Sequence, residues 1–203
     1  MRKTGENVKI KRILVFGPIG AGKSSVLELF KDWGAFTVDC DRITHKILEN
    51  DLEVQSILKE RFGPSVFENG KISRKKLATV AFNSKKNLED LEKTIVPRVF
   101  IEIKRLYEEV KDQNYQAFVV EAPIYPKVET TWKDFFDQKI AVIASKETRT
   151  LRAHQKGLTP QELELRSSYQ IPLEELGLHA DLVLENNYTI NELKQQFLKK
   201  VTP

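Results

Sequence analysis

The sequence lacks several features that mark exported and membrane proteins. Its 203 residues include one cysteine, Cys40, so no internal disulfide can form, and one thiol falls short of a multi-cysteine metal site. No apolar run approaches the roughly 20 residues that cross a bilayer. Residues 1–12 are polar and charged where a signal peptide needs an apolar centre. We therefore expect a protein of the reducing cytoplasm that has no membrane partner.

Charge of one sign is not concentrated in any segment. The chain carries 33 Lys plus Arg against 29 Asp plus Glu, a formal charge of +4, but basic pairs such as Lys75-Lys76 and Lys199-Lys200 lie in segments that also carry acids. Solvated helix faces explain this pattern better than a nucleic-acid-binding stripe. We expect no nucleic-acid partner, and the small basic surplus suits a small anionic ligand equally well. With 40% hydrophobic residues the chain can bury a core, which excludes wholesale disorder.

Short β-rich runs alternate with longer segments whose apolar residues are spaced three and four apart. Nearly unbroken apolar runs such as residues 13–16 favour strands that are covered on both faces, as in a parallel sheet with helices above and below. The sequence therefore predicts an α/β fold. We expect its strands near residues 10–16, 36–38, 116–121, 139–144 and 181–184.

The strand signal disappears over residues 41–114, and helical spacing takes its place at 52–62, 73–82 and 84–107. We expect the third of these helices to be interrupted near Pro97. No low-complexity linker separates the stretch as an independent unit. The sequence thus predicts a sheet core, formed by residues 1–41 and 115–203, and a helical insertion over 42–114 that helps to form a cleft.

Two helix starts downstream carry a reciprocal capping pattern. Thr159 is followed three residues later by Glu162, and Thr189 is followed in the same way by Glu192. In each pair the hydroxyl can accept from a first-turn N–H while the carboxylate accepts from the N–H of the threonine. Both pairs therefore predict a capping box.

Residues 17–24 match the phosphate-loop pattern GxxxxGK[ST] in full, directly after an apolar strand and directly before a helical pattern. Glycines let the backbone curl so that successive N–H groups point into one hollow, and the following helix directs its positive end there. The expected ligand is the phosphate chain of a nucleotide, with Lys23 neutralising the β- and γ-phosphates and Ser24 completing the coordination of Mg²⁺. The predicted nucleotide-binding residues of this segment are Gly17, Ile19, Gly20, Ala21, Gly22, Lys23, Ser24 and Ser25.

Three acids follow predicted strands and are candidates for the chemistry. Asp39 and Asp41 end the second strand, at the sheet edge that the phosphate loop shares. Period-two alternation directs both to one side, so one can accept or orient the proton of an acceptor hydroxyl while the other supports metal-bound water. The alternative for Asp41 is to cap the helix that follows. Glu121 ends another strand, where phosphate-loop proteins often hold an acid near Mg²⁺, and its alternative is an ordinary surface acid.

Basic residues cluster after the fourth predicted strand. Arg149, Arg152 and Lys156 fall on one predicted helix with spacings of three and four, so they project from one face. This pattern predicts a mobile basic lid, over about residues 145–170, that closes over the transferring phosphates. The alternative is a solvated helix face. Arg166, on the next predicted helix, is expected to converge on the same site.

Taken together, these blocks resemble the dephospho-coenzyme A kinase family over nearly the whole chain. The phosphate loop, a tryptophan-glycine turn and an Asp-x-Asp strand end follow one another in the family's order. The further blocks that are similar to the family are Arg61-Phe62-Gly63, Asn69-Gly70 with Arg74, Glu121-Ala122-Pro123-Ile124, Arg166 to Gln170, and Ala180-Asp181 with Asn186.

The resemblance implies that ATP donates its γ-phosphate to the ribose 3′-hydroxyl of dephospho-CoA, giving CoA and ADP in the last step of coenzyme A biosynthesis. It implies a three-layer P-loop NTPase fold of the α/β class, with a five-stranded parallel sheet, a helical acceptor-binding insertion and a lid. The partners are then two small molecules, with Mg²⁺ as cofactor. The predicted catalytic residues are Lys23, Asp41 and Arg152; Asn186 joins the nucleotide-binding set, and the predicted substrate-binding residues are Asp39, Asp41, Arg74, Glu121, Pro123 and Arg166.

Four departures from the family pattern bear mostly on the acceptor side. His45 and Val96 stand where the family usually has Arg and His, Pro126-Lys127 stands where Phe-Glu is common, and Lys156 replaces the second arginine of the lid. Two alternatives therefore stay open. One is a kinase for another nucleoside or nucleotide acceptor, and the other is an ATP-binding switch protein that is not a kinase.

Overall fold

The computed structural model describes residues 9–123, 132 and 134–202 of the chain. The chain forms two compact units. Unit 1 comprises Met1–Val38 and Lys104–Pro203, and unit 2 comprises Asp39–Ile103. Within the described part, every helix is too short or too polar to span a bilayer.

Unit 1 is built on a five-stranded parallel sheet, which confirms the predicted α/β class. The strand order is β2-β5-β1-β6-β7. Because β1 lies in the middle, the chain passes to one side of it for β2 and β5 and to the other for β6 and β7. The loop after β1 therefore lies where the connections diverge, the usual place for a ligand in an open parallel sheet. The strands are β1 Lys11–Phe16, β2 Phe36–Asp39, β5 Ala117–Glu121, β6 Gln138–Ile143 and β7 Leu182–Glu185.

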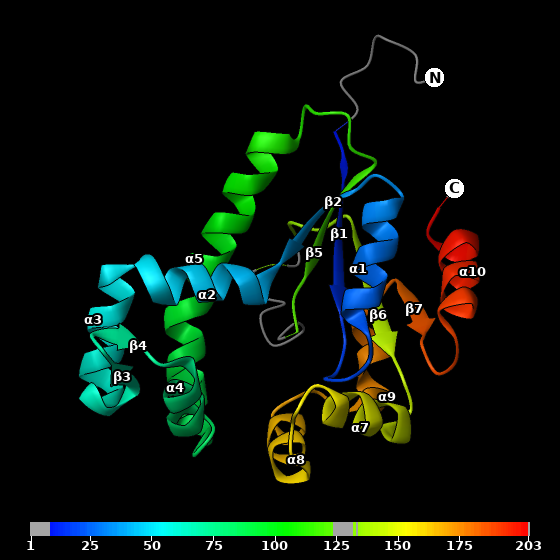
Figure 1. The fold of residues 1–203 in the computed structure, drawn as a ribbon. Coiled ribbons are helices and arrows are strands. Elements are labelled where there is room, and N and C mark those ends of the chain that lie inside the picture. The colour runs from blue at the N-terminus through cyan, green and yellow to red at the C-terminus, as the bar shows by residue number, and fades with distance from the viewer. Residues whose placement is uncertain (1–8, 124–131, 133, 203) are drawn as a thin grey trace. The chain divides into compact units, whose positions relative to one another are not determined.

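Both faces of β1 are buried, as its unbroken apolar run predicts. On one face lie α1 (Lys23–Asp32) and α10 (Ile190–Lys200) (Figure 1). The rings of Phe30 and Phe197 meet there edge to face, with centroids 4.8 Å apart. On the other face Tyr107 packs against Phe118 of β5. Alternate residues of β1 therefore enter two apolar layers, which fixes the strand firmly in the sheet.

The helices after β6 form a short hairpin, α7 (Lys146–Gln155) followed by α8 (Pro160–Ser168). Thr159 is the N-cap of α8 and Thr189 is the N-cap of α10, and both predicted capping boxes are complete. The remaining short elements of this region are α9 Leu173–Leu176 and the 3-10 turn η2 Gly177–His179.

Unit 2 is mainly helical, but one expectation was wrong: the stretch without strand signal contains a two-stranded hairpin. Asn69 and Gly70 form its turn with φ values of 51° and 77°, which Asn-Gly adopts readily. Each strand has two residues, too few to show alternation. The elements are α2 Cys40–Asn50, α3 Leu52–Phe62, the 3-10 turn η1 Pro64–Val66, β3 Phe67–Glu68, β4 Lys71–Ile72, α4 Arg74–Ala81 and α5 Lys85–Val110, which belongs to unit 1 from Lys104 onward.

The predicted interruption near Pro97 is also wrong, because α5 runs through this residue from Lys85 to Val110. Proline removes one intrahelical hydrogen bond and crowds the preceding turn. Ile95, Val99 and Ile103, spaced four apart around it, are at most 7% exposed. Burial of this apolar stripe on both sides of Pro97 accounts for the continuity of the helix, since packing contributes more to helix stability than local propensity does.

Arg12 and Asp137 fasten the start of β1 to the chain just before β6. The guanidinium donates to both carboxylate oxygens at 2.6 and 3.1 Å, and the Arg12 N–H donates at 2.8 Å. The guanidinium also lies 5.1 Å from the centre of the Phe135 ring. Burial raises the pKa of the Asp137 carboxyl, but the hydrogen bonds and charge of Arg12 outweigh it and hold that pKa below 3.8.

We expect Asp137→Asn to lower the free energy of unfolding at pH 7 by about 1–2 kcal/mol, because the pair is charge-assisted but partly exposed. This corresponds to a melting temperature lower by roughly 3–6 °C for a chain of this size. Since the pKa of Asp137 is depressed in the folded state, the stabilisation is present above pH 3.8 and is lost as the pH falls through the pKa of the folded protein. Thermal unfolding at pH 6 and pH 3 should show that the difference in melting temperature between Asp137→Asn and the unchanged protein is smaller at pH 3. Asp134→Asn, at an exposed position nearby, is the control, and an equal loss in both variants would contradict the prediction.

Candidate functional site

The loop between β1 and α1 has the form of an anion site. It turns with Ala21 N–H donating to the Pro18 carbonyl at 3.2 Å, and α1 then begins at Lys23 with Gly22 as its N-cap. The first turn of α1 carries Lys23, Ser24 and Ser25 and no acid. Helix N–H groups and a lysine therefore face one place, which favours a negatively charged ligand.

Two glycines of this loop are required by close neighbours as well as by their backbone angles. A Cβ on Gly20 (φ 79°) would lie 2.5 Å from the carbonyl oxygen of Arg149 in α7, and a Cβ on Gly22 (φ 90°) would overlap the side-chain amide of Asn186. Both positions also need a positive φ, which costs little only for glycine. The curled loop is thus fitted against α7 on one side and against the segment after β7 on the other.

Lys23 is held at the carboxyl end of the sheet by a buried charge pair. Its side chain is 9% exposed, and Nζ lies 3.7 Å from Oε1 of Glu121, whose side chain is 14% exposed. Nζ also donates to the Pro18 carbonyl at 3.3 Å. Glu121 reaches this place because it ends β5 in register with Val15 of β1. A carboxylate beside the ammonium makes a buried lysine tolerable. The prediction that both residues reach the loop is consistent with this geometry.

Asn186 lies behind the loop and is 5% exposed. Its Nδ2 donates to the Ala21 carbonyl at 2.9 Å, and its backbone N–H donates to the Ile143 carbonyl at 2.8 Å. Arg152 joins the same network, with Nη1 donating to the Asn186 carbonyl at 2.9 Å and to the Ala21 carbonyl at 3.4 Å. The structure therefore brings together the loop and the predicted residues Arg152 and Asn186, through backbone carbonyls.

The two aspartates after β2 do not share a face by strand alternation, so that expectation was wrong. β2 ends at Asp39, and Asp41 already lies in the first turn of α2. The capping alternative for Asp41 is also wrong, because Asp39 is the N-cap and its Oδ1 accepts from the N–H groups of Asp41 and Arg42 at 2.8 and 3.2 Å. The Asp41 carboxylate is therefore not used as the cap of its helix.

Of the remaining predicted residues, Arg74 begins α4 of unit 2, and its Nη1 lies 2.7 Å from Nε2 of His45. Pro123 lies two residues after β5, and Arg166 lies on α8, both half-buried. Lys156 is the C-cap of α7 and so lies just beyond the helix on which it was placed. Pro126-Lys127 lies outside the described residues.

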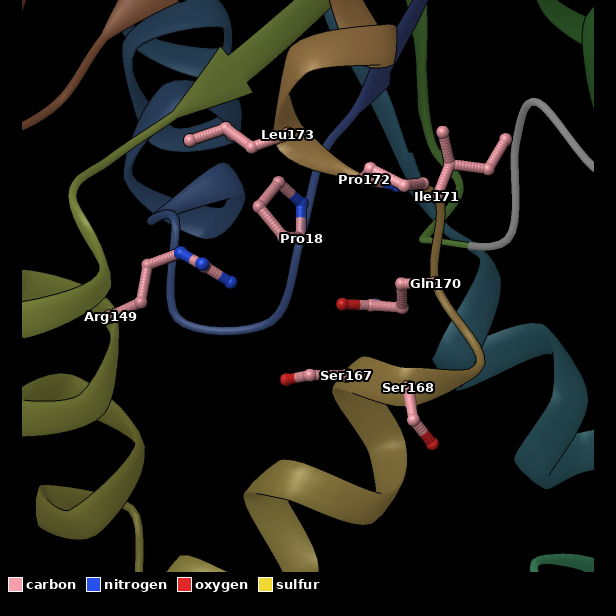
Figure 2. A pocket seen from close by; sticks show the side chains of 8 residues that line it. All are labelled: Pro18, Arg149, Ser167, Ser168, Gln170, Ile171, Pro172 and Leu173. Carbon is pink, nitrogen blue, oxygen red and sulfur yellow. The ribbon is translucent and has the colours of Figure 1, made fainter.

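Sequence reasoning assigned no role to Gln170, which follows α8. Its Oε1 accepts a hydrogen bond of 3.0 Å from the N–H of Ile19 in the phosphate loop, 151 residues away. Gln170, Pro18 and Arg149 line a cavity of about 270 Å³ beside the loop (Figure 2). The only sequence signal was the glutamine at the end of the block from Arg166, whose contact depends on the fold.

Comparison with known proteins points to one family. A family model described as dephospho-CoA kinase matches residues 12–192. A dephospho-CoA kinase of Protochlamydia amoebophila is 32% identical over 192 residues, 93% of each chain. Among solved structures, TT1252 of Thermus thermophilus is 29% identical with a TM-score of 0.76, over 96% of this chain and 100% of that one. A dephospho-CoA kinase from Campylobacter jejuni is 26% identical with a TM-score of 0.58, over 93% and 94% of the two chains.

Proposed function

The chain belongs to the dephospho-CoA kinase family, and from that membership we propose that it transfers the γ-phosphoryl group of ATP to the ribose 3′-hydroxyl of dephospho-CoA. The products are CoA and ADP, so the reaction is the last step of coenzyme A biosynthesis. ATP is the phosphoryl donor that membership of a kinase family implies. The acceptor is proposed from the family.

One observation carries the proposal: a complete phosphate loop at the carboxyl end of the central strand, with Lys23 buried beside Glu121. The N–H groups of the loop and the start of α1 suit the β-phosphate, and the ammonium of Lys23 suits the β- and γ-phosphates. Phosphoryl transfer depends mainly on alignment and charge neutralisation. A loop held by Asn186 from behind is already shaped for that task.

On the acceptor side, Asp41 is the proposed general base. Its carboxylate accepts the proton of the 3′-hydroxyl as that oxygen bonds to the γ-phosphorus, and the bond from this phosphorus to the bridging oxygen of ADP breaks. Support comes from chain connectivity, since Asp41 follows β2 by two residues in a sheet whose carboxyl edge carries the phosphate loop. Asp39, by contrast, has a capping role in addition to any contact with the acceptor.

Mg²⁺ would be held by the Ser24 hydroxyl, which is exposed in the first turn of α1, and by phosphate oxygens of ATP. Among the residues that the structure describes, no group of three His, Cys, Asp or Glu side chains could hold a metal ion. A site with one protein oxygen still fits this ion, which keeps several waters and binds through substrate phosphates. When bound, it neutralises charge that develops between the β- and γ-phosphates.

The lid assignment over residues 145–170 is part of the proposal. α7 and α8 supply Arg152 and Arg166, whose positive charges suit the phosphates. In unit 2, Arg74 and His45 lie together and are proposed to contact an anionic group of the acceptor. In this proposal the helical insertion, residues 42–114, binds dephospho-CoA.

A panel of acceptors tests the function. Purified protein with ATP and Mg²⁺ is incubated separately with dephospho-CoA, nucleosides and nucleoside monophosphates, and the products are separated by chromatography. We expect CoA and ADP in equal amounts from dephospho-CoA alone. Phosphorylation of a nucleoside or nucleotide, with none of dephospho-CoA, would assign the chain to another acceptor.

The switch alternative has its own outcome in the same panel. ATP binding without transfer to any acceptor would favour a binding protein over a kinase. Filter binding of DNA and RNA at low and moderate salt completes the comparison, because a nucleic-acid-associated ATPase binds with a steep salt dependence. We expect no tight binding of either nucleic acid.

A further inference from the structure

We propose that Gln170 is a positioning residue that fastens the phosphate loop to the end of the α7–α8 hairpin and so prepares the loop for ATP. The inference rests on the proposed function only in taking ATP as the ligand of this loop. Gln170 itself need not touch the nucleotide. It acts through the backbone of Ile19.

The first support is the hydrogen bond between the two segments. The N–H of Ile19 donates to Oε1 of Gln170 at 3.0 Å, and both residues are half-buried. Pro18 has no N–H, so Ile19 supplies the first donor after Gly17 in the loop. A partly buried N–H without an acceptor is costly, because it has lost water and gained nothing in return. Gln170 therefore favours the loop conformation in which this N–H points to its side-chain oxygen.

The second support is a separate contact of the same hairpin with the next residue of the loop. Gly20 lies so close to the backbone of Arg149 that a Cβ would be 2.5 Å from its carbonyl oxygen. Arg149 lies near the start of α7, and Gln170 lies two residues after the end of α8. Consecutive loop residues are thus held by the two ends of one hairpin.

The space between these two anchors is a cavity rather than packed core. It measures about 270 Å³, and its lining includes Pro18 of the loop, Arg149 of α7 and Gln170 (Figure 2). Side chains that fill a space would hold the loop by packing. Where the space is open, the hydrogen bond from Ile19 bears more of the restraint. Loss of Gln170 should therefore loosen the loop without removing part of a packed core.

The experiment replaces Gln170 by methionine, which keeps the length of the side chain and removes the acceptor. We expect the dissociation constant of ATP, measured by calorimetry with Mg²⁺, to rise about fivefold, the usual effect of one net hydrogen bond. Turnover at saturating ATP should change less than twofold, because the bound nucleotide itself orders the loop. In the nucleotide-free protein, hydrogen exchange at the Ile19 amide should be faster by a similar factor.

Gln196→Met is the matched control. Gln196 makes the same kind of bond, with its Oε1 accepting from the N–H of Glu185 at 3.2 Å, and its Nε2 also donates to the Glu185 carbonyl at 2.7 Å, but it lies on α10. We expect this variant to bind ATP within about twofold of the unchanged protein and to leave exchange at Ile19 as it was.

Two results would overturn the inference. One is an unchanged affinity for ATP in Gln170→Met, and the other is an equal rise in both variants, which would reflect general destabilisation. Failure of the proposed function is distinguishable, because the unchanged protein would then make no CoA in the acceptor panel. In that case, hydrogen exchange at the Ile19 amide still tests whether Gln170 restrains the phosphate loop.

Discussion

Replacing Lys23 by methionine is expected to lower the turnover number of phosphoryl transfer about 100- to 1000-fold, the usual loss when one preorganised charge at a reacting centre is removed. The ammonium is buried at the carboxyl end of β1, 3.7 Å from Glu121 and within hydrogen-bond reach of the Pro18 carbonyl. The ammonium is therefore already held in place before a triphosphate binds. A coupled assay of ADP release at saturating dephospho-CoA measures the loss.

This variant also removes the ammonium from beside Glu121, whose side chain is 14% exposed, so its fold has to be tested separately. Removing one member of a buried charge pair destabilises by about 3–5 kcal/mol. The double variant Lys23→Met with Glu121→Gln removes both charges, and we expect it to recover much of the melting temperature and none of the turnover. Recovery of both would mean that the single variant failed by unfolding.

Lys31→Met is the matched control on the same helix. Lys31 lies in the last turn of α1, and its side chain is 65% exposed beside Glu28. An exposed pair of this kind contributes at most about 1 kcal/mol, so turnover should stay within about twofold. Equal losses in the two lysine variants would show that the effect belongs to the helix and not to the loop.

The parts of the fold that could be predicted are those encoded locally. β1 was predictable because Ile13 to Phe16 are all apolar, and α8 because Thr159 and Glu162 form a reciprocal cap. The two errors have different causes. The β3–β4 hairpin is too short to show a period, and the local effect of Pro97 is outweighed by burial of the stripe around it.

The candidate site divides in the same way. The phosphate loop is one contiguous segment with a fixed spacing, so its residues were identified directly. Lys23 was expected near phosphate and Glu121 near Mg²⁺, but their ion pair depends on the register of β5 with β1. The contact of Gln170 with Ile19 spans 151 residues, and no local pattern encodes it. Glycine spacing predicts a curled loop, but not which side chains hold it from outside.

Asp39 and Asp41 lie in different elements, although the sequence predicted one strand end for both. Alternation along a strand gave both residues the same direction, yet β2 ends at Asp39 and the next residues are helical. Asp39 caps α2 with Oδ1. Capping and catalysis, which were the two alternatives for Asp41, can therefore be tested at two separate residues.

We expect Asp41→Asn to lower the turnover number about 100- to 1000-fold while the dissociation constant of ATP changes less than threefold, because a general base acts on the acceptor and not on the nucleotide. The amide keeps the size of the side chain but cannot accept the proton of the 3′-hydroxyl. Since the cap of α2 is Asp39, the melting temperature should stay within about 2 °C of the unchanged protein, the effect of a few tenths of a kcal/mol from one charge in a first helical turn. Single-turnover kinetics with ATP and dephospho-CoA separate the chemical step from binding.

Two companion variants decide how this result is interpreted. Glu49→Gln makes the same carboxylate-to-amide change near the other end of α2, at an exposed position, and should leave turnover within about twofold. Asp39→Ala removes the cap and should lower the free energy of unfolding by about 1 kcal/mol. If Asp41→Asn turns over within threefold of the unchanged protein, Asp41 is not the base. If instead Asp41→Asn loses as much stability as Asp39→Ala, the lost turnover reflects the helix, because a carboxylate that only receives a proton contributes little to the stability of the free protein.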